Sequence, residues 1–349
     1  MTNKVEENKL LNKYPKIKKL YLKFKSIVLK NIGKKNFALA VSGGPDSLCL
    51  AFFSKLYISE FKNKIEILIV NHKLRKESGK EALKVKRILK EKNMQSKILY
   101  WKGKIPVSNI QQKARNIRYN LISKHCSKKK IKYLITAHHM DDQIENFFIR
   151  LFRGSGVSGL SSMSERFDYS KNLKIIRPFL TSKKENLKFV TLKYYKNYIH
   201  DPSNEDEKYL RVRIRKHRKK FEKEGLDDSK IIKTVNNLLS ADKALSYYKN
   251  KALYKHVSFL SKNKCQINSK IFSEEAGEII FKSFCDILSL ISGSYYPPRS
   301  KKILNLINRI KKPNFNKSTL GGCVVEKKEN FILISKELGL RKEAQQPHK

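Results

Sequence analysis

The sequence lacks several features that would assign it to common classes of protein. Its five cysteines, at positions 49, 126, 265, 285 and 323, are odd in number, widely separated and never spaced as Cys-x-x-Cys. This spacing argues against disulfides, zinc ribbons and iron–sulfur ligation, and it favours a reducing compartment, so we expect a cytoplasmic protein. No run approaches the ~20 apolar residues of a membrane span. The polar, Lys-rich residues 1–25 contain no apolar stretch of the kind that a secretory signal needs.

Acidic residues are also scarce. The 349 residues include 31 Asp and Glu against 77 Lys and Arg, which gives a formal net charge of +46. A charge of this size predicts strong, salt-dependent binding to polyanions such as nucleic acids. A proteome biased toward lysine would explain part of the excess, but the charge exceeds what solubility requires. Since 40% of the residues are hydrophobic, the chain can bury a core, and its length predicts two or three domains.

Two common phosphate-binding motifs, Gly-x-x-x-x-Gly-Lys-[Ser/Thr] and Gly-x-Gly-x-x-Gly, are absent. In their place, Ser-Gly-Gly-Pro-Asp-Ser lies between an apolar run at residues 37–41 and a helical pattern at residues 48–57. Glycines allow close approach of the backbone to an anion, and the start of the following helix attracts negative charge. Asp46 would repel a bare phosphate, so we expect it to hold Mg²⁺ against one. The alternative is a Ser-Gly-Gly turn with Asp46 as an ordinary helix cap. The candidate phosphate-binding residues are Ser42, Gly43, Gly44, Pro45, Asp46 and Ser47.

Short apolar runs alternate with helical patterns through the first half of the chain. We predict strands at residues 37–41, 65–70, 97–101, 131–136 and 173–176, and helices at residues 48–57, 77–92, 109–126 and 141–152. This alternation predicts βαβ units and therefore an α/β, Rossmann-like parallel sheet with helices on both faces. Ligands of such sheets bind beyond the carboxyl ends of the strands.

The pattern changes after residue 215. Lys-rich helical segments cover residues 226–262, followed by a helix at 303–310, a strand at 331–334 and a polar tail at 341–349 that we expect to be disordered. We therefore expect a basic lead-in at residues 1–35, a catalytic domain at 36–215 and a basic, mainly helical nucleic-acid-binding region at 216–349, with a small α/β part at its end.

The loop at residues 42–47 resembles the Ser-Gly-Gly-x-Asp-Ser motif of N-type ATP pyrophosphatases of the PP-loop superfamily. Further segments, in the expected order over about residues 37–215, make the chain similar to the tRNA(Ile)-lysidine synthase family. They are Val70-Asn71-His72-Lys73-Leu74-Arg75, Ala114-Arg115-Asn116-Ile117-Arg118-Tyr119, Thr136-Ala137-His138-His139-Met140-Asp141-Asp142-Gln143-Ile144-Glu145, Arg153-Gly154-Ser155-Gly156 with Gly159-Leu160, Arg177-Pro178 and Asp201-Pro202-Ser203-Asn204. Thr319-Leu320-Gly321-Gly322-Cys323 resembles a motif of the family's C-terminal domain less specifically. The chain departs from the family at Asn71, an acidic position, and at Val212, an asparagine position.

The resemblance implies a ligase that joins L-lysine to C2 of the wobble cytidine of an isoleucine tRNA with a CAU anticodon. ATP would adenylate the C2 oxygen, which is otherwise a very poor leaving group, and AMP and pyrophosphate would be released. The product reads AUA instead of AUG, and the tRNA changes identity from methionine to isoleucine. The implied cofactors are ATP and Mg²⁺, and the implied partners are this tRNA and L-lysine.

The resemblance also suggests roles for individual residues. Asp142 and Glu145 are spaced i, i+3 and share a helix face. We expect the two carboxylates to bind the ammonium groups of lysine and help deprotonate the attacking one; the alternative is a helix start enriched in acids. The remaining implied roles are catalysis by Asp46 and Arg115, nucleotide binding by His72 and His138, binding of the lysine carboxylate by Arg211, and tRNA contacts by Arg118, Arg213 and Arg215. A buried structural role stays open for His138 and His139, and a solvated helix face for Arg115 and Arg118.

Three other functions fit the sequence less well. A tRNA thiolase with the same loop generally needs a Cys-x-x-Cys motif or a catalytic cysteine pair. A glutamine-dependent ligase needs a glutaminase domain, with either a cysteine after Met1 or a Gly-x-Cys-x-Gly turn, and here Thr2 follows Met1 and no such turn occurs. A non-enzymatic RNA-binding protein would leave the phosphate loop and the acidic cluster unexplained.

Overall fold

The computed structural model of the chain describes residues 2–73, 77–103, 110–161, 163–170, 172–201, 206–294 and 297–337. Several segments that the sequence singled out, residues 74–75, 109, 202–204 and the tail at 341–349, lie outside the described residues. The chain forms two compact units, Met1–Asn236 and Asn237–Lys349. No helix in the described ranges is long and apolar enough to cross a membrane.

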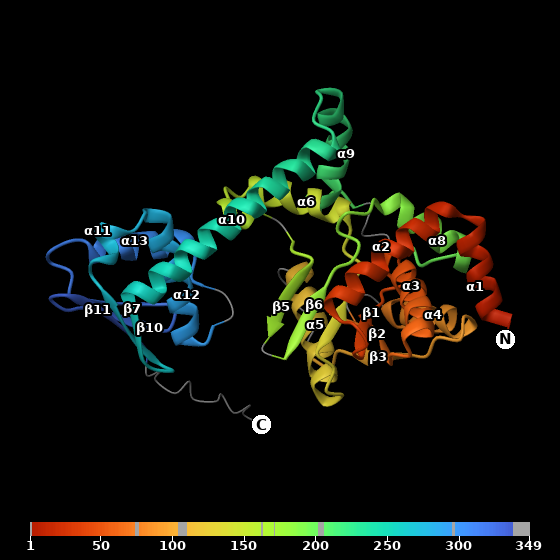
Figure 1. Cartoon of the computed structure of the whole chain (residues 1–349), viewed down its shortest axis with the longest axis horizontal. Coiled ribbons are helices and arrows are strands. Elements are labelled where there is room, and N and C mark those ends of the chain that lie inside the picture. Colours follow the sequence, from red (N-terminus) through yellow and green to blue (C-terminus); the bar gives the residue numbers. More distant parts are fainter. Residues whose placement is uncertain are drawn as a thin grey trace. The chain divides into compact units, whose positions relative to one another are not determined.

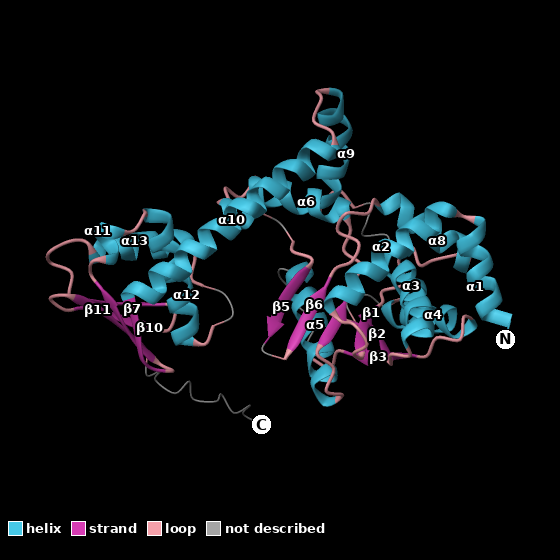
Figure 2. Cartoon of the chain, in the orientation of Figure 1, coloured by secondary structure: helices cyan, strands magenta, loops and turns pink. Residues whose placement is uncertain are grey.

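A six-stranded sheet forms the centre of the first unit (Figures 1 and 2). Its strands are β1 (Phe37–Ala40), β2 (Ile65–Asn71), β3 (Ser96–Tyr100), β4 (Tyr133–Ile135), β5 (Arg166–Ser170) and β6 (Leu173–Ile176). The order is β3-β2-β1-β4-β6-β5, and every neighbouring pair is parallel except β5 with β6. The predicted Rossmann-like parallel sheet is therefore confirmed, and the antiparallel edge strand β5 is an addition that the sequence did not reveal.

Helices cover both faces of this sheet. They are α1 (Thr2–Lys13), α2 (Pro15–Asn31), α3 (Pro45–Phe61), α4 (Ser78–Glu91), α5 (Ile110–Lys128) and α8 (Lys184–Tyr195). Successive strand residues point to opposite faces. Accordingly, Leu39 and Ile67 belong to one apolar core with α2, α3, α4 and α8, whereas Ala38 and Leu68 belong to another with α5. The strands are buried on both sides, which explains why they are short, nearly continuous apolar runs in the sequence.

The strand order reverses between β1 and β4. From β1 the chain passes through α3 to β2 on one side, whereas β4 pairs with the opposite side of β1. A crevice at the carboxyl ends of the strands is expected at such a reversal. The loop at residues 42–47 leaves β1 there, and residues 136–139 leave β4 there.

A smaller apolar cluster holds three further helices together in the first unit. These are α6 (Met140–Leu151), α9 (Leu210–Lys223) and the beginning of α10 (Asp228–His256), while the short α7 spans Val157–Leu160. Ile144 and Phe148 of α6 pack with Ile214 of α9 and Ile231 of α10. Because α9 is rich in arginine, this packing brings basic side chains close to the acidic start of α6.

The second unit contains an antiparallel sheet of five strands, ordered β7-β8-β11-β10-β9. Its elements after α10 are β7 (Val257–Ser261), β8 (Lys264–Asn268), α11 (Ile271–Glu274), α12 (Gly277–Ser292), α13 (Ser300–Ile310), β9 (Lys317–Leu320), β10 (Cys323–Lys327) and β11 (Phe331–Lys336). The expected mainly helical character of this region is therefore wrong. Edge strands β7 and β9 have no buried residue, so they lack the alternation of apolar and polar residues that predicts a strand.

The Thr319–Cys323 segment has a clear structural role in this sheet. Gly321 and Gly322 both have positive φ, +63° and +79°, and they connect β9 to β10, in which Leu320 pairs with Cys323. A two-residue hairpin loop of this kind requires residues that accept positive φ. Adjacent glycines meet that requirement.

Candidate active site at the strand ends

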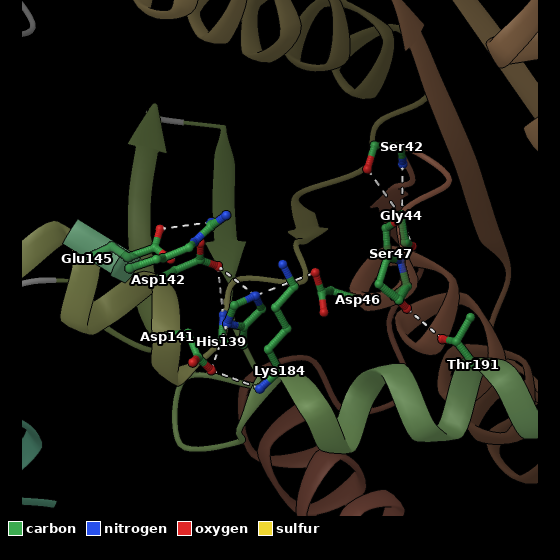
Figure 3. A network of polar contacts seen from close by, with 12 residues as sticks. Ser42, Gly44, Asp46, Ser47, His139, Asp141, Asp142, Glu145, Lys184 and Thr191 are labelled. Atoms are coloured by element: carbon green, nitrogen blue, oxygen red, sulfur yellow. Dashed lines mark hydrogen bonds and ion pairs between the residues drawn. The ribbon is translucent and has the colours of Figure 1, made fainter. Parts of the chain in front are cut away.

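The loop between β1 and α3 is held in shape by its own hydrogen bonds (Figure 3). The Ser47 hydroxyl accepts the backbone N–H of Ser42 at 3.2 Å and that of Gly43 at 3.1 Å, and it donates to the carbonyl oxygen of Gly44 at 2.9 Å. Ser47 is buried, whereas Ser42 is exposed. The Ser47 hydroxyl is therefore the centre of the loop's hydrogen bonds, and Ser42, although exposed, donates its own hydroxyl to Oγ of Ser47 at 3.4 Å.

The two glycines of the loop serve different purposes. Gly43 has φ +89°, and a Cβ there would lie 2.4 Å from Cγ2 of Val85 and 2.9 Å from Cγ1 of Ile199. Gly44, the N-cap of α3, has ordinary dihedrals, and a Cβ there would meet only the Ser42 hydroxyl oxygen at 3.9 Å. Gly43 is thus required by packing inside the protein, while Gly44 borders open space at the start of α3. Pro45 occupies the first turn of that helix, where its missing N–H costs nothing.

Asp46 faces His139, the residue that caps α6 (Figure 3). Its Oδ2 lies 3.5 Å from Nε2 of His139, and its Oδ1 is buried without a hydrogen-bond partner. The imidazole also lies 3.6 Å from Oδ2 of Asp141 and 3.5 Å from Oδ2 of Asp142. Burial alone would lower the pKa of His139, but the hydrogen bond to Asp46 and the charges of the three carboxylates outweigh it and raise the pKa.

Asp142 and Glu145 lie on one face of α6, as their spacing predicts, and Arg215 of α9 is opposite them. Asp142 accepts the backbone N–H of His139 at 3.1 Å. Glu145 is only 1% exposed, and both of its oxygens accept N–H groups of Arg215, one of them at 3.2 Å. Burial lowers the pKa of Arg215, but the hydrogen bond and charge of Glu145, with the charge of Asp142, reverse the shift and raise it. The structure therefore pairs Glu145 with an arginine of the protein itself.

Asp141, in the first turn of α6, connects three elements. Its Oδ1 accepts Nη1 of Arg218 at 2.7 Å, and its Oδ2 accepts the backbone N–H of Lys184, the first residue of α8, at 2.9 Å. Arg218 also donates Nε to Oδ1 of Asp228, at the start of α10, at 2.6 Å. Sequence reasoning missed Arg218, although Arg211, Arg215 and Arg218 have the i, i+4, i+7 spacing of one helix face.

The two other arginines of the 211–215 segment, Arg211 and Arg213, lie on different sides of α9 because they are two positions apart. Arg213 is exposed and donates to the carbonyl oxygen of Glu207 at 3.2 Å, away from the acidic cluster. Val212, at the asparagine position of the family, is buried.

Arg211 lies close enough to His138 for the charge of the arginine to act on the imidazole. Burial first, and then Arg115, Arg177 and Arg211, hold the pKa of His138 well below its ordinary value, so the ring is neutral. Its Nδ1 lies 2.8 Å from the Thr136 hydroxyl.

His72 and Arg118 meet at the end of β2. Nη2 of Arg118 lies 3.3 Å from Nε2 of His72, and burial, together with the arginine charge, lowers the pKa of His72 to about 4. His72 is therefore a neutral acceptor. Asn71, at the acidic position of the family, is buried and accepts the backbone N–H of Lys73 at 2.9 Å. Arg115 is exposed on α5, with its guanidinium 5.1 Å from the centre of the Tyr119 ring.

The site contains little that could hold a metal ion by itself. Within the described ranges, no group of three or more His, Cys, Asp or Glu side chains is arranged to bind one. Mg²⁺ in nucleotide sites is commonly held by one or two carboxylates together with the phosphates of the substrate. Asp46, with its unpartnered buried oxygen, fits that kind of site.

The Ser-Gly-Gly-Pro-Asp-Ser loop after β1, at the reversal of a parallel sheet, is typical of the class of PP-loop proteins. The family model described as a PP-loop domain matches residues 16–220, and this class binds ATP. The U34-tRNA thiolase NcsA from Methanococcus maripaludis, solved with its [4Fe-4S] cluster, has a similar fold, with a TM-score of 0.54 and 19% sequence identity over 64% of this chain and 79% of that one. That similarity concerns the fold alone.

Curated relatives identify the family within this class. The tRNA(Ile)-lysidine synthase of Orientia tsutsugamushi is 34% identical over 86% of this chain and 70% of its own length. That of Wolbachia pipientis wMel is 36% identical over 91% and 74%, and that of Rickettsia akari is 30% identical over 92% and 74%. The chain belongs to the tRNA(Ile)-lysidine synthase family, an ATP-dependent ligase family, as the motifs of its sequence predicted.

Proposed function

We propose that this chain joins L-lysine to C2 of the wobble cytidine of an isoleucine tRNA with a CAU anticodon, using ATP. The observation that supports this most strongly is the preformed phosphate loop at residues 42–47, next to the acidic face of Asp142 and Glu145, in a chain of this family. The product would decode AUA in place of AUG and carry isoleucine identity in place of methionine. We place the reaction in the cytoplasm, where such a tRNA is used.

In the first step, the C2 oxygen of cytosine forms a bond to the α-phosphorus of ATP, and pyrophosphate leaves with the bridging oxygen. The N-terminus of α3 favours the negative charge of the phosphates, and the open space at Gly44 leaves room for them. We assign Ser47 to holding the loop. We assign Ser42 to direct donation, for which its hydroxyl would turn from Oγ of Ser47 to a phosphate oxygen. Bound Mg²⁺ would neutralise phosphate charge, and Asp46 is the residue that would hold it. The neutral rings of His72 and His138 would line the nucleotide pocket, and exposed Arg115 would contact the adenylate.

In the second step, the ε-amine of lysine attacks C2, and AMP leaves with the electrons of the C2–oxygen bond. The amine must be deprotonated before it attacks, so carboxylates that hold its ammonium form and take up its proton suit this step. We assign Asp142 and Glu145 to that role, and Arg211 to the carboxylate of lysine. Since Arg215 occupies Glu145, an incoming ammonium group must displace Arg215 or share Glu145 with it.

The tRNA would be bound mainly by the basic region at residues 216–349, together with Arg118, Arg213 and Arg215. Helix α10 presents four side chains on one face at i, i+4, i+8 and i+11, namely Lys243, Tyr247, Lys251 and Tyr254. All four are exposed, Tyr254 to 95%, and Nζ of Lys251 lies 5.2 Å from the centre of the Tyr247 ring. Lysines suit phosphate contacts, and exposed aromatic rings suit stacking on unpaired bases. We define these four residues as the α10 stripe.

Omission assays with purified protein test the proposal. The full mixture contains ATP labelled at the α-phosphate, labelled lysine, and transcribed isoleucine tRNA with a CAU anticodon. We expect pyrophosphate release to require the tRNA, AMP release to require lysine as well, and label from lysine to appear in the tRNA. A tRNA with uridine in place of the wobble cytidine is the matched control and should accept no lysine. Transfer of lysine to that control, or no transfer to the cytidine-containing tRNA, would contradict the proposal.

A further inference from the structure

Lys184, the first residue of α8, is a basic side chain at the active site to which sequence reasoning gave no role. Its backbone N–H is fixed by Oδ2 of Asp141 at 2.9 Å. Its side chain extends from the start of α8 toward Asp46 and His139, on the side of the phosphate loop (Figure 3). Lys184 is partly buried, so its ammonium group lies within the site rather than in open solvent.

Helix α8 is anchored directly to the phosphate loop. Thr191, which is fully buried, donates its hydroxyl to the carbonyl oxygen of Pro45 at 2.6 Å. Thr191 lies seven positions after Lys184, which is almost two complete helical turns, so both side chains lie on the same face of α8. The face of α8 that touches the loop is therefore the face that carries Lys184.

The position of this charge is unfavourable unless an anion is close. A cation in the first turn of a helix opposes the macrodipole, at a cost of roughly 0.3–1 kcal/mol. In the described part of the chain no carboxylate forms an ion pair with Lys184; Asp141 contacts only its backbone. Moreover, the chain has no lysine in a Gly-x-x-x-x-Gly-Lys-[Ser/Thr] loop that could neutralise the terminal phosphates of a nucleotide. A phosphate group bound at the loop would offset the unfavourable charge of Lys184 at the helix start. In turn, Lys184 would supply the positive charge that the loop itself lacks.

We propose that Lys184 binds the β- and γ-phosphates of ATP and stabilises the pyrophosphate as it leaves. When the bond between the α-phosphorus and its bridging oxygen breaks, the electron pair passes to pyrophosphate, whose negative charge increases. The Lys184 ammonium group donates hydrogen bonds to these oxygens, which are strong because both partners are charged. This inference rests on the proposed use of ATP and adds the residue that recognises its leaving group.

Nucleotide binding by the full chain, without tRNA, tests Lys184. The variants are Lys184→Met, which removes the charge at similar length, Lys184→Arg, which keeps it, and Lys183→Met, which removes the exposed lysine next to it. Isothermal titration calorimetry would measure the Kd for ATP, pyrophosphate and AMP. We expect Lys184→Met to weaken ATP and pyrophosphate binding about ten- to hundredfold, with AMP binding changed less than about twofold. Lys184→Arg should retain most of the affinity, and Lys183→Met should resemble the wild type.

Two results would overturn the role of Lys184. Unchanged ATP affinity in Lys184→Met would show that the ammonium group does not contact the phosphates. Equal losses for ATP and AMP would indicate a general disturbance of α8 instead of lost phosphate contacts. Failure of the proposed function gives a different pattern: wild-type protein would bind ATP, with Lys184 contributing, but would transfer no lysine to the tRNA.

Discussion

Arg215 and Glu145 form a two-point ion pair between α9 and α6, with the carboxylate almost completely buried. Glu145 is one of the two carboxylates that we assign to the ammonium groups of lysine, and in this structure Arg215 already occupies it. Arg215 therefore supplies the positive charge that stabilises the buried carboxylate when no lysine is bound. A buried ion pair costs desolvation energy, and loss of one partner is more harmful than loss of both.

The pairing of Arg215 with Glu145 makes a double variant, Arg215→Gln combined with Glu145→Gln, informative. We expect Arg215→Gln to lower the free energy of unfolding by about 2 kcal/mol, because it leaves the Glu145 charge buried without its partner. Glu145→Gln should cost less stability and should raise the KM for lysine more than about tenfold. The double variant should recover stability without recovering lysine binding. Urea unfolding and lysine-dependent AMP release measure the two quantities. Additive stability losses would contradict a direct Arg215–Glu145 coupling.

The two glycines of the phosphate loop provide a second, matched comparison. Gly43→Ala places a methyl group 2.4 Å from Val85 at a φ of +89°, so we expect a loss of roughly 2 kcal/mol or more in unfolding free energy. Gly44→Ala meets no such obstacle inside the protein, and its melting temperature should stay close to that of the wild type. If phosphate occupies the space beside Gly44, the Gly44→Ala variant should nevertheless bind ATP more weakly. Calorimetry of ATP binding at equal folded fraction would check this, and wild-type affinity in Gly44→Ala would count against that placement of the phosphates.

The parts of this fold that could be predicted from sequence are those in which one local pattern determines the outcome. The runs at residues 37–41 and 65–70 became β1 and β2 because strands buried on both faces are continuous apolar segments. Contacts between segments far apart in the chain left no such signal. Arg215 was expected to contact tRNA, and its pairing with Glu145, 70 positions away, depends on the packing of Ile214 against α6. Likewise, β7 and β9 contain no buried residue, so their composition does not distinguish them from loops.

The pKa values of His139 and His72 are shifted in opposite directions, which predicts opposite effects of pH on stability. His139 has a raised pKa, so its contribution to stability is complete below the ordinary value of 6.5 and is lost as the pH rises through the pKa of the folded state. His72 has its pKa lowered to about 4, so the unfolded chain binds more protons between pH 6.5 and 4, and stability falls as the pH falls through that range. NMR titration of the histidine ring signals should give a pKa above 6.5 for His139 and one near 4 for His72. His139→Gln and His72→Gln assign the two signals, and a reversed assignment would contradict the electrostatic description of the site.

Arg218 should act on the reaction through Asp141. Because it links Asp141 to Asp228, Arg218→Gln should release the first turn of α6 and the start of α8. We expect a lower kcat, with the KM for lysine changed less, and partial recovery in Arg218→Lys. Lys216→Gln is the matched control, since Lys216 pairs with Glu207 at the exposed side of α9. Equal effects of Arg218→Gln and Lys216→Gln would indicate only a loss of positive charge.

The α10 stripe should bind RNA through stacking as well as through charge. Base–aromatic stacking contributes roughly 1–3 kcal/mol for each base, so Tyr254→Ala should weaken tRNA binding about five- to hundredfold, whereas Tyr254→Phe, which keeps the ring, should bind like the wild type. Lys251→Gln should instead reduce the salt dependence of binding, because it removes one phosphate contact. Filter binding of the isoleucine tRNA at several salt concentrations separates these effects. Melting temperatures should not change, since the Tyr254 side chain is almost fully exposed. If Tyr254→Ala and Tyr254→Phe bound tRNA equally well, the ring would have no part in RNA recognition, and the lysines alone would account for the affinity of the stripe.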